Sequence, residues 1–330
     1  MKLRHTILFT LFALLCVALF VMDIALGSVS IPMADIIDAL AGRATAEVRS
    51  IVIDLRLVRA AMAILAGSAL AVSGLEMQVL FRNPLAGPYI LGISAGASLG
   101  VALYTLGIPL LGIALPTALQ SLGSAGAAWI GSAVVLALVL ALSRRIKDIM
   151  VILILGIMLS SSVGAIVELL QYFSDEASLK SYVVWTMGSL GDVTMSQLWL
   201  LLPIVAIGLT LAIATIKPMN ILLAGERYAA SMGINLARTR LLILSATTLL
   251  AGTVTAFCGP IGFVGIAAPH IARIVFRSAD HRTLLPASVL TGVAMLLLSD
   301  IIAGCFTLPI NTITALMGIP VVAYIVTRKR

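Results

Sequence analysis

The sequence predicts an all-α integral membrane protein that forms a single domain over residues 1–330, with about ten transmembrane helices, some of them short or broken. Three observations predict this class. The chain is 61% hydrophobic and only 11% charged, whereas a soluble domain carries about 25% charged residues. Apolar runs of about 20 residues recur, and each is long enough to span a bilayer. Lysine and arginine gather in short clusters between these runs, as they do in cytoplasmic loops.

The first apolar run predicts a retained span. It reads MKLRHTILFTLFALLCVALFVMDIALG, and no small-x-small site closes it, which argues against a cleaved signal peptide. Residues 28–55 are more polar and are expected to form an external loop with some helix.

The second and third spans are expected between Arg56 and Gly100, with a break between them at Arg82-Asn83-Pro84-Leu85. Pro84 lacks an amide donor and disfavours helix at Asn83, so the break predicts a turn.

The rest of the chain continues this alternation. An apolar region at 107–122 is broken by two prolines, and the segment 172–195 is polar enough to lie outside, with a short helix. Residues 217–240 are the longest basic segment and are expected on the cytoplasmic side. The remaining spans are a run ending near Ser143 and those at 149–171, 196–216, 241–258, 261–275, 284–305 and 310–327.

The charge distribution orients the predicted spans with both termini in the cytoplasm. This topology places 16 of the 21 Lys and Arg residues inside. The outside retains Arg43, Arg49, Arg56, Arg59 and Lys180, so four arginines around one external loop run against the rule. The span at 261–275 is short and interrupted by glycine and proline, which is typical of backbone that lines a cavity.

Enzyme signals in the sequence are weak, and we assign no catalytic residue and no metal site. Gly92-Ile93-Ser94-Ala95-Gly96 has the Gly-x-Ser-x-Gly pattern of hydrolases, but it opens an apolar segment, where close helix packing explains it better. The chain has no Gly-x-x-x-x-Gly-Lys-Ser/Thr motif for nucleotides. The clustered basic residues fit membrane loops, not a nucleic-acid surface.

Three acidic residues within the predicted spans, Glu76, Glu168 and Asp300, leave two interpretations open. Ionisable groups in a membrane are costly, so they either line a polar path or hold helices together. Asp300 is expected at the same depth as Arg56 and Arg59 and could pair with either one.

A resemblance to a known family begins in the stretch from Arg56 to Gly100, which reads RLVRAAMAILAGSALAVSGLEMQVLFRNPLAGPYILGISAGASLG. It continues, in order, through GERYAASMGINLARTR, CGPIGFVGIAAPHIAR, DHRTLLPAS and LPINTITALMGIPVVAYIV, and so covers essentially the whole chain. These motifs resemble the FecCD family, the permease subunits of ABC importers for iron-siderophore complexes, haem and cobalamin.

The resemblance implies ten membrane helices per subunit and two permease copies around a central path, most simply a homodimer. Two partner ATPase subunits would use ATP and Mg, while this chain would bind no cofactor. An external, periplasmic or lipid-anchored binding protein would deliver the substrate. The segment 217–240 would couple to the ATPase through Gly225, Glu226, Ala229, Ala230, Met232 and Gly233.

Two further groups of residues match the family's path and its docking surface. Asn83 and Leu85 correspond to the cytoplasmic gate, and the span at 149–171 would line the path, with Ser160, Ser161 and Gly164 keeping it open and weakly polar.

Arg56 and Arg59 match basic positions that receive acidic residues of the binding protein. The family's Asp-x-x-Ala-Arg reads Asp300-Ile301-Ile302-Ala303-Gly304 here, so one expected docking arginine is missing.

The sequence therefore predicts a non-enzymatic permease of the inner membrane that imports an iron chelate, either a siderophore complex or haem. A cobalamin permease of the same family is the alternative. A secondary transporter driven by an ion gradient is a further alternative, and Glu76 would then be part of its ion relay.

Overall fold

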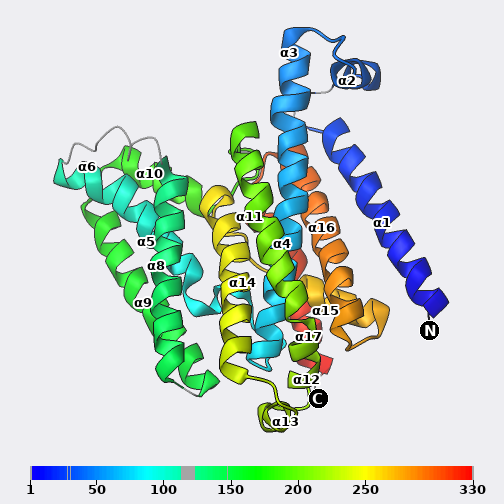
Figure 1. Ribbon diagram of the computed structural model, residues 1–330. Coiled ribbons are helices and arrows are strands. Elements are labelled where there is room, and N and C mark those ends of the chain that lie inside the picture. Colours follow the sequence, from blue (N-terminus) through cyan, green and yellow to red (C-terminus); the bar gives the residue numbers. More distant parts are fainter. Residues whose placement is uncertain (1, 28, 30, 113–122, 147, 329–330) are drawn as a thin grey trace.

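The computed structural model describes residues 2–27, 29, 31–112, 123–146 and 148–328, and this part of the chain is a helical bundle (Figure 1). Nine of its helical segments are long and apolar enough to cross a bilayer, and the shorter apolar helix α15 joins them. The main helices of these ten segments are α1 (Lys2–Ala25), α4 (Val58–Leu80), α5 (Ile93–Ala102), α8 (Gly123–Arg145), α9 (Ile149–Phe173), α11 (Met195–Ala214), α14 (Leu236–Cys258), α15 (Val264–Phe276), α16 (His281–Phe306) and α17 (Ile310–Arg328).

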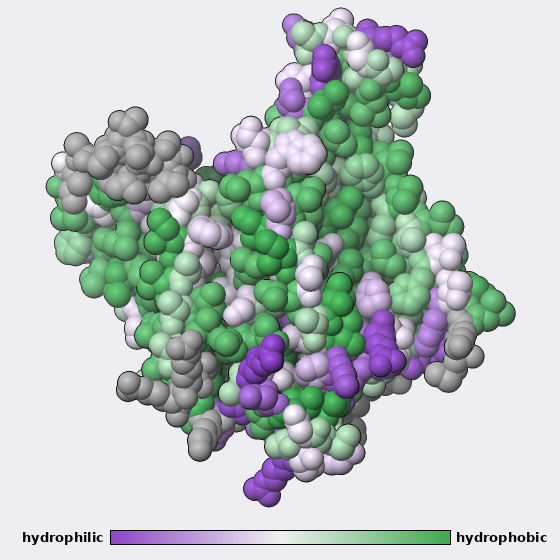
Figure 2. Space-filling view, viewed as in Figure 1, coloured by the Kyte–Doolittle hydropathy of each residue, from purple (hydrophilic) through white to green (hydrophobic). Residues whose placement is uncertain are grey.

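Shorter elements lie at the two ends of the bundle. The upper end in Figure 1 carries α2 (Met33–Leu40), α3 (Ala46–Arg49), α6 (Ile108–Leu111) and α10 (Glu176–Thr186). The lower end carries α12 (Ile216–Leu222) and α13 (Glu226–Ser231), and both termini also lie toward it. Hydrophobic side chains cover the middle of the face in Figure 2, and hydrophilic ones gather at the lower end and on the tip formed by α2 and α3. This distribution is that of a multi-pass membrane protein.

The core of the bundle is formed by α4, α14 and α16. In their most apolar 18-residue windows, 67, 72 and 61% of the residues are buried, against 17% in α9. Small residues let these helices approach closely. A Cβ atom on Gly67 of α4 would lie 2.6 Å from the carbonyl oxygen of Gly292 in α16. Gly96 lies equally close to Gly131 of α8, so the second glycine of the Gly-x-Ser-x-Gly pattern serves helix packing.

The structure corrects the predicted external loop at residues 28–55. α2 occupies part of it, but α3 and the π-helical segment η1 (Ser50–Leu57) run directly into α4 as one helix from Ala46 to Leu80. Thirty-five helical residues extend about 50 Å, and the hydrocarbon core is only about 30 Å thick. The α2 and α3 end therefore stands clear of the hydrocarbon.

Two breaks interrupt the bundle within its depth. The 3₁₀ segment η2 (Pro88–Leu91) precedes α5, and residues 259–263 separate α14 from α15. The Tyr89 hydroxyl donates to the Ile261 carbonyl at 3.0 Å, and the Gly262 amide donates to Asn311 Oδ1 at 2.9 Å. These bonds satisfy backbone groups that lipid could not. The predicted boundary between the spans at 241–258 and 261–275 falls in this second break. The later helix, α15, begins at Val264 and not at residue 261.

The predicted region at 107–122 lies largely outside the described residues. Its described part contains Gly107, at the end of the π-helical segment η3 (Leu103–Gly107), and then α6.

Candidate functional site

The predicted coupling segment is built from two short helices at the lower end of the bundle. Gly225 has φ +117° and directly precedes α13, and Gly233 has φ +80° shortly after it. Glycine adopts such angles without strain, so the two glycines set the ends of α13, as the sequence predicted.

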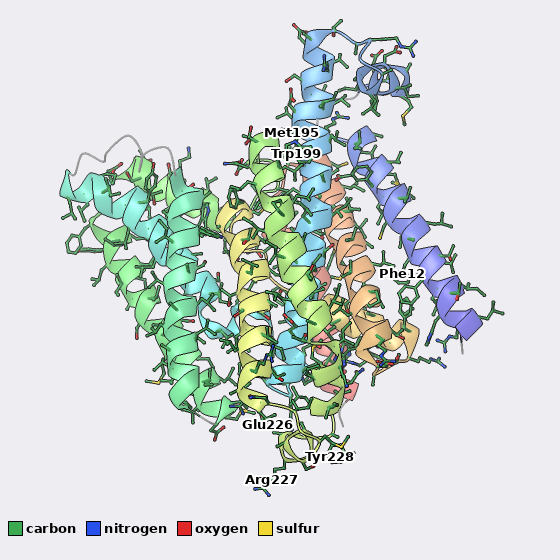
Figure 3. All side chains as sticks on the ribbon, in the orientation of Figure 1. Phe12, Met195, Trp199, Glu226, Arg227 and Tyr228 are labelled. Atoms are coloured by element: carbon green, nitrogen blue, oxygen red, sulfur yellow. The ribbon has the colours of Figure 1, made fainter. Side chains whose placement is uncertain are left out.

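The side chains of α13 divide into an inner and an outer set. Ala229 is fully buried, whereas Ala230, Met232 and Tyr228 are exposed. Figure 3 shows Arg227 projecting from α13 away from the bundle. Glu226 forms an ion pair of 2.7 Å with Arg240 at the start of α14. Among the predicted coupling residues, Ala230 and Met232 therefore face outward, while Ala229 and Glu226 hold α13 to the chain.

A second anchor of this segment was not predicted. Asn220 of α12 accepts hydrogen bonds through Oδ1 from the backbone amide and Nδ1 of His281, at 2.8 and 2.7 Å. Its Nδ2 donates to Asp280 Oδ1 at 2.7 Å. Asp280 also caps α16 by accepting from the Arg282 amide, and these bonds lower the pKa of its carboxyl. The Asp280 position before a helix is a recognisable N-cap signal, but nothing local in the sequence points to Asn220.

The predicted gate turn lies next to the coupling segment. Asn83 Oδ1 accepts a hydrogen bond of 3.0 Å from the Leu85 amide, which fixes the turn after Arg82. A Cβ atom on Gly225 would lie 3.4 Å from Arg82 Nη2. The structure thus brings the turn that carries Asn83 and Leu85 against the start of α13.

The predicted path residues lie on α9. Ser160, Ser161 and Ser162 each donate to the carbonyl four residues earlier in the same helix, at 2.9 to 3.1 Å. Ser161 is exposed, whereas Ser160 and Gly164 are half-buried. A Cβ atom on Gly92 would lie 3.2 Å from Ser160 Oγ, so Ser160 packs against the end of η2, which follows the gate turn.

Glu76 lies in the core and not beside these path residues. It is fully buried in α4 and accepts hydrogen bonds from Thr247 of α14 at 2.9 Å and from Thr215 at 3.3 Å. These contacts are those of a residue that holds helices together. Glu168 is exposed on α9.

Arg56 and Arg59 lie near the upper end of α4 and already have partners. Arg59 forms an ion pair with Asp300 of α16, with Nε 2.8 and 2.7 Å from the two carboxylate oxygens. Of the two expected partners of Asp300, Arg56 and Arg59, it is Arg59 that forms the ion pair. Arg56 donates instead to the backbone carbonyls of Ile24 and Ala25 at the end of α1. Sequence reasoning missed Asp23 of α1, which is buried and lines the same cavity as Arg59 and Asp300.

The Arg59–Asp300 pair lines two adjoining cavities of about 440 and 360 Å³ near the upper end of the bundle. Both cavities also reach Gly191 and Gly304. A Cβ atom on Gly304 would lie 3.4 Å from Arg59 Nη2. The position at which the resemblance predicts an arginine therefore lies directly beside the guanidinium group of Arg59.

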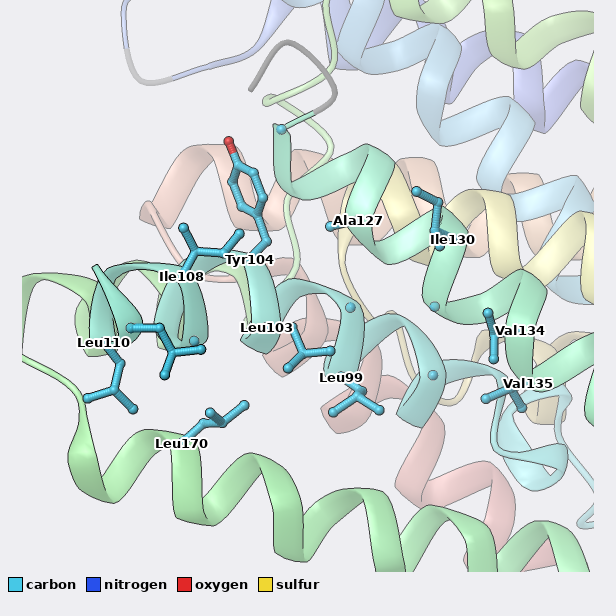
Figure 4. Close-up of a pocket in the computed structure, with 16 residues that line it drawn as sticks. Leu99, Leu103, Tyr104, Ile108, Leu110, Ala127, Ile130, Val134, Val135 and Leu170 are labelled. Atoms are coloured by element: carbon cyan, nitrogen blue, oxygen red, sulfur yellow. The ribbon is translucent and has the colours of Figure 1, made fainter. Parts of the chain in front are cut away.

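A separate cavity of about 550 Å³ lies between α5 and α8 (Figure 4). Leu99, Leu103, Ile130 and Val134 line it, and Tyr104 supplies a hydroxyl group. Among the described residues no charged side chain lines this cavity.

Comparison with known proteins agrees with this architecture. The model of the FecCD transport family matches residues 14–328. The hemin transport permease HmuU of Yersinia pestis is 37% identical over 287 residues, which cover 84% of this chain and 83% of that protein. The vitamin B12 import permease BtuC of Citrobacter koseri is 37% identical over 281 residues, which cover 84% and 82% of the two chains.

Two solved structures show the same architecture. One, described as an inward-facing metal-chelate type ABC transporter, superposes with a TM-score of 0.84 at 29% identity and covers 97% of this chain and 99% of that chain. The other, PsaBC of Streptococcus pneumoniae, has a TM-score of 0.59 at 18% identity and covers 88% of this chain and 94% of its own, which shows a shared fold.

Proposed function

The chain belongs to the FecCD transport family, and from that membership we propose that it is the permease subunit of an ABC importer that moves an iron chelate, haem or a ferric siderophore, into the cytoplasm. The observation that carries this proposal is the superposition over 97% of the chain on a metal-chelate type transporter. The name of the hemin permease supports haem as cargo. Cobalamin is the second candidate, because the vitamin B12 permeases are equally similar.

The division of labour follows from the two ends of the bundle. Residues 217–240, with α13 standing out at the lower end, would dock into an ATPase, whose ATP and Mg would power transport. The recess at Arg56 and Arg59, at the other end, would receive an external binding protein. Because most basic residues fall at the α13 end, the lower end and both termini would lie in the cytoplasm of an inner-membrane protein.

The path itself would form between two copies of the chain, most simply a homodimer. α9 is the least buried of the crossing helices, and its exposed face carries Ser161. Hydroxyl groups bonded to their own helix present a weakly polar wall, on which a large chelate binds poorly and therefore does not become trapped.

The gate turn would connect the two functions, because it touches α13 on one side and leads through η2 to Ser160 on the other. Asn83 and Leu85 would close the cytoplasmic end of the path. If α13 moves together with the ATPase, its contact with Arg82 would transmit the movement to Asn83 and Leu85.

Reconstitution tests the proposal. Proteoliposomes that contain this chain, its ATPase and its binding protein should accumulate haem, a ferric siderophore or cobalamin only when ATP is supplied, and the preferred cargo identifies the substrate. The chain alone should neither hydrolyse ATP nor accumulate any of the three. Uptake by the chain alone, driven by a proton or sodium gradient, would overturn the proposal.

A further inference from the structure

Four arginines from three helical segments lie at the lower end of the bundle, where Figure 2 shows hydrophilic side chains. Arg4 is in the first turn of α1, and Arg273 is in the last turn of α15. Arg277 directly follows α15, and Arg282 is in the first turn of α16. We call these four residues the basic cluster.

The start of α1 is fastened to the end of α15. Arg4 Nη2 donates to the Val275 carbonyl at 3.0 Å, and His5 Nε2 lies 3.1 Å from the carbonyl oxygen of Phe276. The last carbonyls of a helix have no partner within it, so α1 supplies donors that α15 needs. These contacts bring Arg4 to the end of α15, where Arg277 follows Phe276.

The basic cluster has too few acidic partners. Neither of the two ion pairs formed by the described residues involves it. Asp280, in the connection between α15 and α16, already accepts hydrogen bonds from the Asn220 side chain and from the Arg282 amide. One carboxylate cannot balance four guanidinium groups, so the cluster retains positive charge that an anion can neutralise.

Arg277 adds a second observation, because it occupies a backbone conformation that suits glycine. Its φ is +49°, and its amide ends α15 by donating to the Arg273 carbonyl. Glycine is the usual residue at such a helix end, whereas an arginine must accept local strain. Its side chain is exposed and forms no hydrogen bond or ion pair with the described residues. The strain is therefore accepted at a position whose guanidinium is free for an external partner.

An apolar stripe continues from Arg4 along α1. Leu8, Leu11 and Leu15 follow Arg4 at helical spacing on the same face, and Leu11 and Leu15 are 56 and 45% exposed. The 24 residues of α1 extend about 36 Å, slightly more than the hydrocarbon core. Arg4 near the helix start therefore lies at the depth of the lipid headgroups, with the stripe in the hydrocarbon beside it.

We propose that the basic cluster binds the phosphate group of an anionic phospholipid, whose acyl chains lie along Leu8, Leu11 and Leu15. Arg4 and Arg277 contact the phosphate, and Arg273 and Arg282 flank it. Guanidinium groups pair with phosphate oxygens through charge-assisted hydrogen bonds. Basic sites between membrane helices suit such headgroups. This inference requires only the membrane fold and does not depend on the cargo.

A soluble phosphate compound fits this surface less well than a lipid. It would use the arginines but leave the apolar stripe of α1 unused. The two sources share the phosphate, so glycerol phosphate, which has the headgroup chemistry without acyl chains, separates them.

Binding of phosphatidylglycerol to the delipidated full-length chain in non-ionic detergent tests the proposal, with phosphatidylcholine of the same acyl chains as the reference. We expect phosphatidylglycerol to bind at least about tenfold more tightly, since each arginine contributes about fivefold. Arg277→Gly should lower this preference about fivefold. The same change relieves the backbone strain at φ +49°, so the melting temperature without lipid should not fall. Arg282→Gln, which leaves that backbone unchanged, should also lower the preference.

Two matched controls separate charge from backbone effects. Arg227→Gln removes one exposed arginine from α13, at the same end of the bundle but outside the basic cluster. Thr307→Gly relieves a similar positive φ of +52° after α16, at the opposite end. Both controls should keep the wild-type preference for phosphatidylglycerol.

Three results would overturn the inference. The first is a wild-type preference in both Arg277→Gly and Arg282→Gln. The second is an equal loss in Arg227→Gln, which would show attraction to the whole lower end. The third is glycerol phosphate that competes at the concentration of the lipid, which would show a site for soluble phosphates. Phosphatidylglycerol that stays bound when the ATPase is added supports the lipid, and its displacement would assign the cluster to the ATPase instead.

Discussion

Gly74 of α4 lies against Gly265 of α15 so closely that a Cβ atom on Gly74 would come within 1.7 Å of the Gly265 carbonyl oxygen. That atom belongs to the backbone, so it cannot turn aside. We expect Gly74→Ala to cost about 3 kcal/mol or more through overpacking and to lower the melting temperature sharply. Gly164→Ala is the matched control, because no atom lies within 4 Å of its Cβ position in α9. A normal melting temperature for Gly74→Ala would mean that α4 and α15 do not pack as described.

Glu76 distinguishes ATP-driven import from an ion-coupled mechanism. Glu76→Gln keeps an oxygen that can accept from Thr247 or Thr215, so ATP-driven uptake should persist within about twofold. Glu76→Ala leaves buried hydroxyl groups without this acceptor and should cost about 1–3 kcal/mol of stability. Uptake and melting temperature are measured on the same preparations. A stable Glu76→Gln protein without uptake would favour an ion relay through this carboxyl.

The two faces of α13 predict opposite consequences for the same substitution. Ala230→Glu, on the exposed side, should abolish copurification of the ATPase and leave the melting temperature of the permease unchanged. Ala229→Glu, on the buried side, places a charge inside the protein and should destabilise the segment itself. Pull-down of the ATPase and protease sensitivity between residues 217 and 240 separate the two effects. Normal copurification by Ala230→Glu would place the ATPase contact elsewhere.

The Arg59–Asp300 pair predicts a rescue. Arg59→Gln leaves the buried Asp300 carboxylate without its counter-charge, at a cost of up to about 3 kcal/mol, reduced by the 35% exposure of the Arg59 side chain. The double variant Arg59→Gln, Asp300→Asn removes both charges and should recover most of the loss. The melting temperatures of the single and double variants form the measurement. Additive losses would show that the two side chains do not depend on each other.

Much of the fold could be predicted because spanning helices depend on local composition. Runs of apolar residues, with basic residues at one end, identified the crossings, and Gly225 and Gly233 marked the ends of α13. The sequence wrongly predicts a loop at residues 46–55, because Glu47, Arg49 and Asp54 make this stretch resemble a polar segment. A helix of 35 residues is longer than the hydrocarbon is thick, so charged side chains at its outer end can remain in water, where they cost little.

The details of the sites depend on contacts between distant segments. Asp23 and Asp300 line one cavity, Asn220 contacts His281, and Thr247 donates to Glu76, each pair from different helices. No local pattern encodes such partners, because short polar residues inside an apolar run look alike until the helices are packed. Arg59 was the exception, since a charged residue at a known depth requires an opposite charge at the same depth.

The short helix α15 also constrains how the chain is made. Its 13 residues extend about 20 Å, less than the roughly 30 Å of hydrocarbon that a span must cross. During synthesis, a segment of this length has little tendency to leave the translocon for lipid on its own. Its release into the bilayer therefore depends on surfaces supplied by α4, which is made long before it, and by α16, which is made immediately after it. A ribosome paused just beyond Phe276 would hold α15 without its second neighbour, and the bundle closes only once residues 281–306 have emerged.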